Sequence, residues 1–278
     1  ELASLMNWKK TTMDDIKNKD DEKEIQEKRD EVESYKPFNK EYAVNDFIFM
    51  CFMVGNDFLP HIPSLEIIEG SIDNMIEIYK NVCKTYGHLT RKRKDEIKFS
   101  KKSLTVFLGT ISRDEKSMLE DKLYKKDKFF PDLILEKNGK YKEDKWDINI
   151  ENYRKDYYEH NLPNTDNKKI CHEYLDGLQW VLSYYTRGVP NWEWCFKHHY
   201  APFAYDIAQH IEKYVFQKYK ESSPMLPFQQ LLSVLPPKSH RLIPEPLNKL
   251  LSDENSAIKK YCPDKIEIDV SGKRQEWE

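Results

Sequence analysis

The feature that most constrains this chain is an apolar run that stops at a glycine. Residues 46–53, "DFIFMCFM", contain one polar residue, Asp46, and lead into "VGNDFLPHIP" at residues 54–63. Eight to ten such residues form either a buried strand or a buried helix, and periodicity does not separate the two. We expect this element to cover residues 46–54, with Asn45 or Asp46 as its cap. The run therefore predicts a buried element that carries a polar turn at its end.

Two segments show helical periodicity. In residues 71–87 apolar side chains recur at spacings of three and four, with Ser71 placed as an N-cap and Gly87 at the end. Residues 171–187 carry a similar apolar face, and Gly188 follows directly. We expect a helix in each segment.

The later part of the chain predicts shorter elements. A helix should restart near Pro202 and run to about Tyr219. The segments 227–237 and 244–253 each read as a short helix with proline at its start. Residues 266–273 alternate like a strand that runs into a turn. The fold class expected from these patterns is mainly α, with few short strands.

Two charged segments interrupt these elements. Residues 9–36 are too poor in apolar side chains to bury a face, which is typical of a solvated helix or a linker. Lysine-rich residues between 88 and 168 contain two short amphipathic pieces, 101–111 and 147–160, and predict a peripheral helical insert. We expect four regions. Residues 1–44 form a charged linker or insert, and residues 45–87 hold the Gly-Asn-Asp motif. Residues 88–168 form the lysine-rich insert, and residues 169–278 form a last helical region.

Composition excludes several classes of protein. Charged residues make up 33% of the chain, yet the net charge is −3, which argues against nucleic-acid binding by bulk charge. The five cysteines are widely spaced and never form C-x-x-C. They indicate neither a disulfide framework nor a zinc site, and they favour a reducing intracellular compartment. No apolar run approaches the roughly 20 residues of a membrane span.

Asp57 stands on the turn behind the buried run. A carboxylate there is a suitable ligand for a hard cation, because the buried element fixes its position and the turn exposes it. Phosphodiester hydrolysis by two metals needs several converging carboxylates, and nothing directs the following Glu66 and Glu69 to the same point. The alternative is that Asn56 and Asp57 cap the next turn. The residues alone leave both interpretations open.

An aromatic segment, residues 189–207, follows the second predicted helix. Aromatic side chains on irregular backbone can stack on unpaired bases, at about 1–3 kcal/mol per base. They can equally fill a core and satisfy a polar tip. His198 and His199 lack a third ligand at suitable spacing, so we predict no zinc site here.

Four blocks of the sequence resemble one family. Residues 46–80, "DFIFMCFMVGNDFLPHIPSLEIIEGSIDNMIEIYK", resemble a signature block of the 5′→3′ exoribonuclease (XRN) family. Residues 174–207, 225–251 and 266–278 are similar to three further blocks, in the family's order. The resemblance covers about residues 45 to 278 and is weakest in the lysine-rich middle.

The resemblance implies a fold and an activity. The chain would be a mainly α fragment, the carboxy-side portion of an α/β nuclease core of the PIN/flap-endonuclease-like group. The implied reaction is processive 5′→3′ degradation of single-stranded RNA with a 5′-monophosphate, dependent on Mg²⁺ or Mn²⁺. A metal-activated water would attack the first phosphodiester in line.

The resemblance also assigns roles to residues. Asp57 matches a catalytic metal ligand of the family, and Asn56 would support the site without binding the ion. A tryptophan would stack on the terminal bases, and Arg187 would line the same groove. The residues expected to bind RNA are Trp192, Trp194, Trp180, Arg187, His199 and Tyr200.

The family's other metal carboxylates lie in an amino-terminal portion that this chain lacks. That portion is therefore an expected partner, no membrane is expected as a partner, and the chain by itself is predicted to be inactive. Residues 54–67, "VGNDFLPHIPSLEI", resemble the nuclear branch of the family, whereas "PFQQLL" and "GKRQEWE" resemble the cytoplasmic branch. We expect a cytoplasmic location, with a nuclear one as the alternative. Two alternatives remain: a non-catalytic helical protein-interaction module, and a structure-specific flap nuclease acting on DNA.

Overall fold

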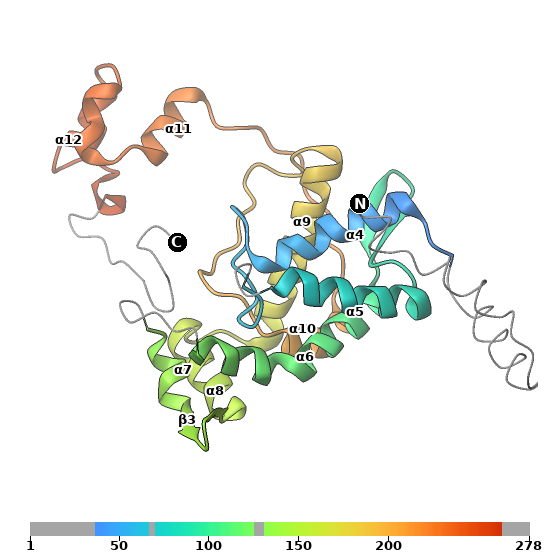
Figure 1. The fold of residues 1–278 in the computed structure, drawn as a ribbon. Coiled ribbons are helices and arrows are strands. Elements are labelled where there is room, and N and C mark those ends of the chain that lie inside the picture. Colours follow the sequence, from blue (N-terminus) through green and yellow to red (C-terminus); the bar gives the residue numbers. More distant parts are fainter. Residues whose placement is uncertain (1–36, 67–69, 125–130, 263–278) are drawn as a thin grey trace, which may run out of the picture. The chain divides into compact units, whose positions relative to one another are not determined.

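A computed structural model describes residues 37–66, 70–124 and 131–262. In these ranges the chain is mostly helical and its strands form two antiparallel hairpins (Figure 1), which confirms the predicted fold class. The α-helices are α4 (Lys40–Cys51), α5 (Ser71–Tyr86), α6 (Lys101–Tyr124), α7 (Leu133–Asn138), α8 (Ile150–Asn161), α9 (Asn167–Arg187), α10 (Ala204–His210), α11 (Pro227–Val234) and α12 (Asn248–Ser252). The strands are β1 (Thr90–Arg93), β2 (Glu96–Phe99), β3 (Gly139–Lys142) and β4 (Lys145–Ile148).

The chain divides into two compact units. The described residues 37–124, 133–190 and 195–218 belong to the first unit, apart from the gap at 67–69, and 131–132, 191–194 and 219–262 belong to the second. None of the helices in the described ranges is long and apolar enough to cross a membrane.

In the first unit, neighbouring helices pack against one another. α5 contacts both α4 and α6, and α10 contacts both α6 and α9 (Figure 1). Leu104, Phe107, Leu108 and Ile111 of α6 are 0% exposed. The expected peripheral position of residues 88–168 is therefore wrong for α6, whose apolar stripe lies at the centre of this unit.

The apolar run is helical, and its helix begins earlier than predicted. Asn39 caps α4, since its side chain accepts a hydrogen bond from the N–H of Tyr42 at 3.1 Å. The prediction of Asn45 or Asp46 as the cap is wrong. A 3₁₀ turn, Phe52–Val54, continues α4 up to the glycine that follows.

Asp46 lies in the middle of α4 and is 0% exposed. Its Oδ1 accepts hydrogen bonds from the N–H and the hydroxyl of Thr90, both at 2.6 Å. Its Oδ2 accepts from Tyr79 at 2.7 Å, from His88 at 2.7 Å and from the N–H of Leu89 at 3.0 Å. One buried carboxylate thus ties α4 to α5 and to the start of β1.

His88 completes this network. Burial lowers the pKa of His88, whereas hydrogen bonds to Asp46 and Cys83 act to raise it. The backbone N–H of Asn39 opposes this rise, because it donates to Nε2 at 3.0 Å and needs the lone pair there. We therefore assign the neutral ring with its hydrogen on Nδ1, where it donates to Asp46.

Predicted helix ends are confirmed at some positions and wrong at others. α9 ends at Gly188, whose φ is 94°, and α5 ends at Gly87. Gly70 rather than Ser71 takes the N-cap position of α5. α10 does not reach Tyr219: the chain is extended at Tyr214, whose buried hydroxyl donates to Asp176 at 3.2 Å.

The second unit holds α11 and α12, which confirms short helices in both proline-flanked segments. Pro227 occupies the first turn of α11 as predicted, whereas α12 begins after its prolines, at Asn248. α11 has no buried residue. The strand predicted at 266–273 lies outside the described residues.

Replacing Asp46 with alanine should strongly destabilise the first unit, because at least five donors would lose their buried acceptor. We expect Asp46→Ala to lower the free energy of unfolding by about 3–5 kcal/mol, the range for breaking a buried charged network. Urea denaturation followed by circular dichroism measures this change. The control, Asp57→Ala, removes an exposed carboxylate and should stay within about 0.5 kcal/mol of the parent. Equal losses in both variants would contradict the role assigned to Asp46.

Candidate functional site

The turn behind α4 begins with a residue that must be glycine. Gly55 has φ = 95°, a region that side chains rarely adopt. A Cβ at this position would also come within 3.4 Å of His61. The backbone therefore reverses here, and the following polar residues leave the core.

Asn56 and Asp57 differ in their contacts. The Oδ1 atom of Asn56 accepts hydrogen bonds from the N–H groups of Phe58 at 2.8 Å and Leu59 at 2.9 Å. Asn56 thus caps the turn. Asp57 is exposed, and among the described residues no side chain or backbone group forms a hydrogen bond or ion pair with its carboxylate.

Aromatic contacts attach this turn to α9. The ring of Phe58 lies 5.1 Å from the ring of Trp180 and 5.1 Å from that of Tyr184, measured between centroids. Two residues after Phe58, the carbonyl of Pro60 accepts a hydrogen bond from the hydroxyl of Tyr174 at 3.0 Å. These contacts with α9 therefore hold the backbone of the turn in place beneath its exposed tip.

α6 holds the other end of the turn. Ser64 donates to Glu115 Oε1 at 3.1 Å, and the same oxygen accepts from the N–H of Ala204 at the start of α10 at 3.0 Å. Lys122 donates to the carbonyl of Pro63 at 2.6 Å. Glu115 is 2% exposed and was not recognised in the sequence, where it lies among ordinary charged residues.

Burial raises the pKa of Glu115 from 4.5 to about 7, although hydrogen bonds from Ala204, Tyr205 and Ser64 oppose the rise. The neutral carboxyl is thus favoured in the folded state, and the folded protein holds a proton that the unfolded chain releases. Its contribution to stability is complete below about pH 4.5 and is lost as the pH rises to about 7.

Glu115→Gln should remove this part of the pH dependence, because glutamine does not ionise. The wild-type chain is expected to lose about 3 kcal/mol more than the variant between pH 4.5 and pH 7. Denaturant titrations of both proteins at a series of pH values measure the difference. Parallel stability curves would show that Glu115 does not titrate in this range.

The turn has one side chain that could bind a divalent cation, the carboxylate of Asp57. An exposed carboxylate without a protein partner is free to bind a hard cation, whereas the Asn56 oxygen is already used. Glu66 forms an ion pair with Lys122 at 2.5 Å, and Glu69 lies outside the described residues. The turn thus offers Asp57 as a single ligand to a site that other groups must complete.

One buried group of potential metal ligands lies elsewhere in the described chain: Asp46, Cys83 and His88. The oxygens of Asp46 already accept five hydrogen bonds, and both ring nitrogens of His88 have partners. A cation would have to displace these donors. We therefore interpret the group as a structural network.

The predicted RNA-binding residues fall into different environments. Trp180 is 4% exposed and its ring stacks on Tyr184 with an interplanar angle of 6°, which argues against a base stacking on it. Trp192 is 53% exposed and Trp194 is half-buried; both belong to the second unit.

The remaining candidates are on the first unit. Arg187, at the end of α9, forms an ion pair with Glu96 at 2.8 Å. His199 is exposed, and the ring of Tyr200 packs edge-on against Tyr157 with centroids 5.9 Å apart. Of the predicted residues, Trp180 lies next to the turn, because its ring contacts that of Phe58.

Trp180→Ala should therefore act on stability. Removing a buried tryptophan typically costs about 3–5 kcal/mol, whereas Trp192→Ala removes an exposed ring and should cost less than about 1 kcal/mol. Thermal or urea unfolding of the two variants compares them directly. A Trp180 variant as stable as the parent would contradict its place in the base of the turn.

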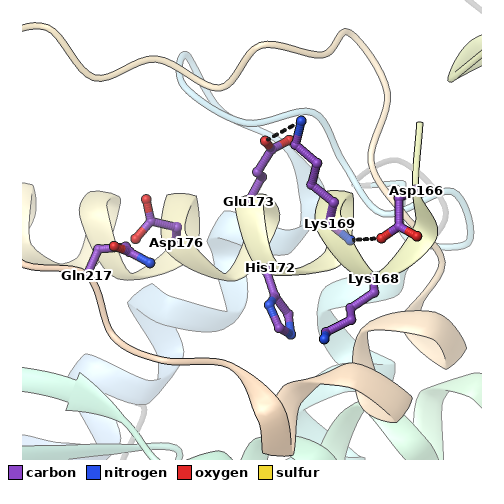
Figure 2. A pocket seen from close by; sticks show the side chains of 7 residues that line it. All are labelled: Asp166, Lys168, Lys169, His172, Glu173, Asp176 and Gln217. Atoms are coloured by element: carbon purple, nitrogen blue, oxygen red, sulfur yellow. Dashed lines mark hydrogen bonds and ion pairs between the residues drawn. The ribbon is translucent and has the colours of Figure 1, made fainter. Parts of the chain in front are cut away.

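A pocket of about 410 Å³ lies along α9 (Figure 2). Two of its carboxylates are already paired. Glu173 accepts from His198 at 2.8 Å and pairs with Lys169 at 3.9 Å. Asp176 accepts from the hydroxyl of Tyr214. None of the predicted site residues lines this pocket, so we place the candidate site at the turn.

Comparisons with known proteins agree with the resemblance seen in the sequence. The family model described as "Xrn1 helical domain" matches residues 37–151 and 112–278. A Drosophila melanogaster 5'-3' exoribonuclease 2 homolog is 32% identical over 87% of this chain and 33% of its own length. Human 5'-3' exoribonuclease 1 is 28% identical over 87% of the chain and 17% of its own length. Saccharomyces cerevisiae 5'-3' exoribonuclease 1 is 39% identical over 46% of the chain and 9% of its own length.

These matches define the class of the protein. The chain belongs to the XRN family of 5'-3' exoribonucleases, in the part described as the Xrn1 helical domain. It spans about a third of the length of the exoribonuclease 2 relatives that it matches.

Proposed function

We propose that this chain is part of a processive 5′→3′ exoribonuclease that degrades single-stranded RNA with a 5′-monophosphate and depends on Mg²⁺ or Mn²⁺. The observation that carries the proposal is the open carboxylate of Asp57 on a turn fixed at both ends, in a chain of this family. The printed names of the relatives, 5'-3' exoribonucleases, support the type of reaction.

In this proposal Asp57 is one oxygen ligand of a divalent cation. When bound, such a cation activates water and stabilises the charge that develops on the phosphate. Asn56 keeps the turn in shape through its two hydrogen bonds to backbone N–H groups. The exposed ring of Trp192 is available for stacking on a base, with Trp194 as the alternative.

The other metal ligands would come from an amino-terminal portion of the same protein. Residues 225–234, which include α11, support a contact with this amino-terminal portion. Five of their apolar side chains are 37–67% exposed, and α11 buries none of its residues. These side chains are Met225, Leu226, Phe228, Leu231 and Val234. The chain alone should then be inactive. Its cytoplasmic location stays a prediction.

Asp57→Ala in the complete polypeptide should abolish degradation of 5′-monophosphorylated RNA. The loss should be at least about 100-fold in rate, since a metal ligand contributes several kcal/mol to the stabilisation of the transition state. A time course with magnesium on an end-labelled single-stranded RNA measures it. The matched control is Asp73→Ala, an exposed aspartate in the first turn of α5, which should retain the parent rate.

The same assay separates the alternatives. A variant at Asp57 that degrades RNA normally, together with a Trp194→Ala variant that loses a protein contact, would favour a non-catalytic interaction module. Preference for a DNA flap over phosphorylated RNA would favour a flap nuclease. Magnesium-dependent degradation by the 278-residue chain itself would refute the prediction that it is inactive alone.

A further inference from the structure

The hairpin of β1 and β2 presents a cationic outward face. Its register places Arg91 opposite Lys98 and Arg93 opposite Glu96. Residues directly opposite in a pair of strands share one face. Thr90, on the other face, is 0% exposed, so the face with the arginines points away from the core.

A fourth cation from α9 joins this face. Glu96 is its single carboxylate and accepts from Arg187 at 2.8 Å and from Lys98 at 3.1 Å. Arg91, Arg93, Lys98 and Arg187 together with Glu96 give the face a net charge of +3. One carboxylate cannot balance four cations, so this face keeps excess positive charge although Lys98 and Arg187 both pair with Glu96.

The cationic face and the candidate turn both contact α9. Trp180, Tyr184 and Arg187 follow one another at spacings of four and three, which places them on one side of α9. Phe58, the neighbour of Asp57, packs on the first two. The same side of α9 thus carries the base of the turn and, two helical turns on, the arginine that contacts the hairpin.

We propose that this face binds the phosphate backbone of the RNA whose end is processed at the Asp57 turn. Guanidinium groups match phosphate oxygens with paired hydrogen bonds. Arg91 and Arg93 are two residues apart on one strand, roughly 6.7 Å, which is comparable to the separation of consecutive phosphates in an extended strand. The inference rests on the proposed function, because it takes RNA as the ligand.

The second hairpin of the chain provides a matched control. β3 and β4 are also four residues each, and Lys142 lies opposite Lys145. This hairpin packs mainly against α6 and α7. A ligand attracted by overall positive charge would bind both hairpins. An RNA strand that extends from the turn would bind the hairpin of β1 and β2.

The test measures RNA affinity without cleavage. The complete polypeptide, in a chelating buffer, is titrated with a labelled long single-stranded RNA at a series of salt concentrations, and anisotropy gives the binding constant. Each lost phosphate contact lowers the slope of log K against log salt by about 0.7 for single strands. Arg91→Gln with Arg93→Gln should therefore reduce the slope by about 1.4, and Lys142→Gln with Lys145→Gln should leave it unchanged.

Two results would overturn the inference: equal slopes for the arginine variant and the parent, or an equal reduction in both hairpin variants. Displacement of RNA by polyglutamate of the same charge would also overturn it, in favour of an acidic protein ligand. The Asp57→Ala protein separates this test from that of the proposed function. If the Asp57→Ala protein still degrades RNA and the arginine variant shows the reduced slope, the proposed role of Asp57 is wrong. RNA binding by the cationic face is then still supported.

Discussion

The carboxylate of Asp46 is the interaction on which the rest of the first unit depends. A buried carboxylate is tolerated only where donors surround it, and its five donors come from α5 and from the segment that enters β1. This requirement sets the position of α4 against both. Because the candidate turn begins directly after α4 and its 3₁₀ extension, the direction in which Asp57 is presented follows from it.

The sequence was a good guide where local rules and tertiary packing agree. The periodicity of α5 and α9 and the glycines behind them predicted both helices and their C-terminal ends. Asp46 was misread as a cap, because aspartate near the start of an apolar run usually has that role. α10 was predicted too long, because the burial of Tyr214 in extended backbone depends on Asp176, far away in the sequence.

The candidate site was predictable in part. The Gly-Asn-Asp turn and its place behind a buried element could be read directly, and the resemblance pointed to Asp57. The separate roles of Asn56 and Asp57 could not, since either side chain can cap a turn and geometry alone decides between them. Glu115 had no signal, because its burial arises from the approach of α10 and of Ser64.

The contact between Tyr174 and Pro60 has a consequence for the order of folding. These residues are separated by 114 positions in the chain. The helix that carries the aspartate turn is therefore synthesised long before the helix that supports it. During synthesis the turn must wait, with Phe58 uncovered, until α9 has emerged. The turn that presents Asp57 thus reaches its final shape late, when α9, the helix that supports it, is complete.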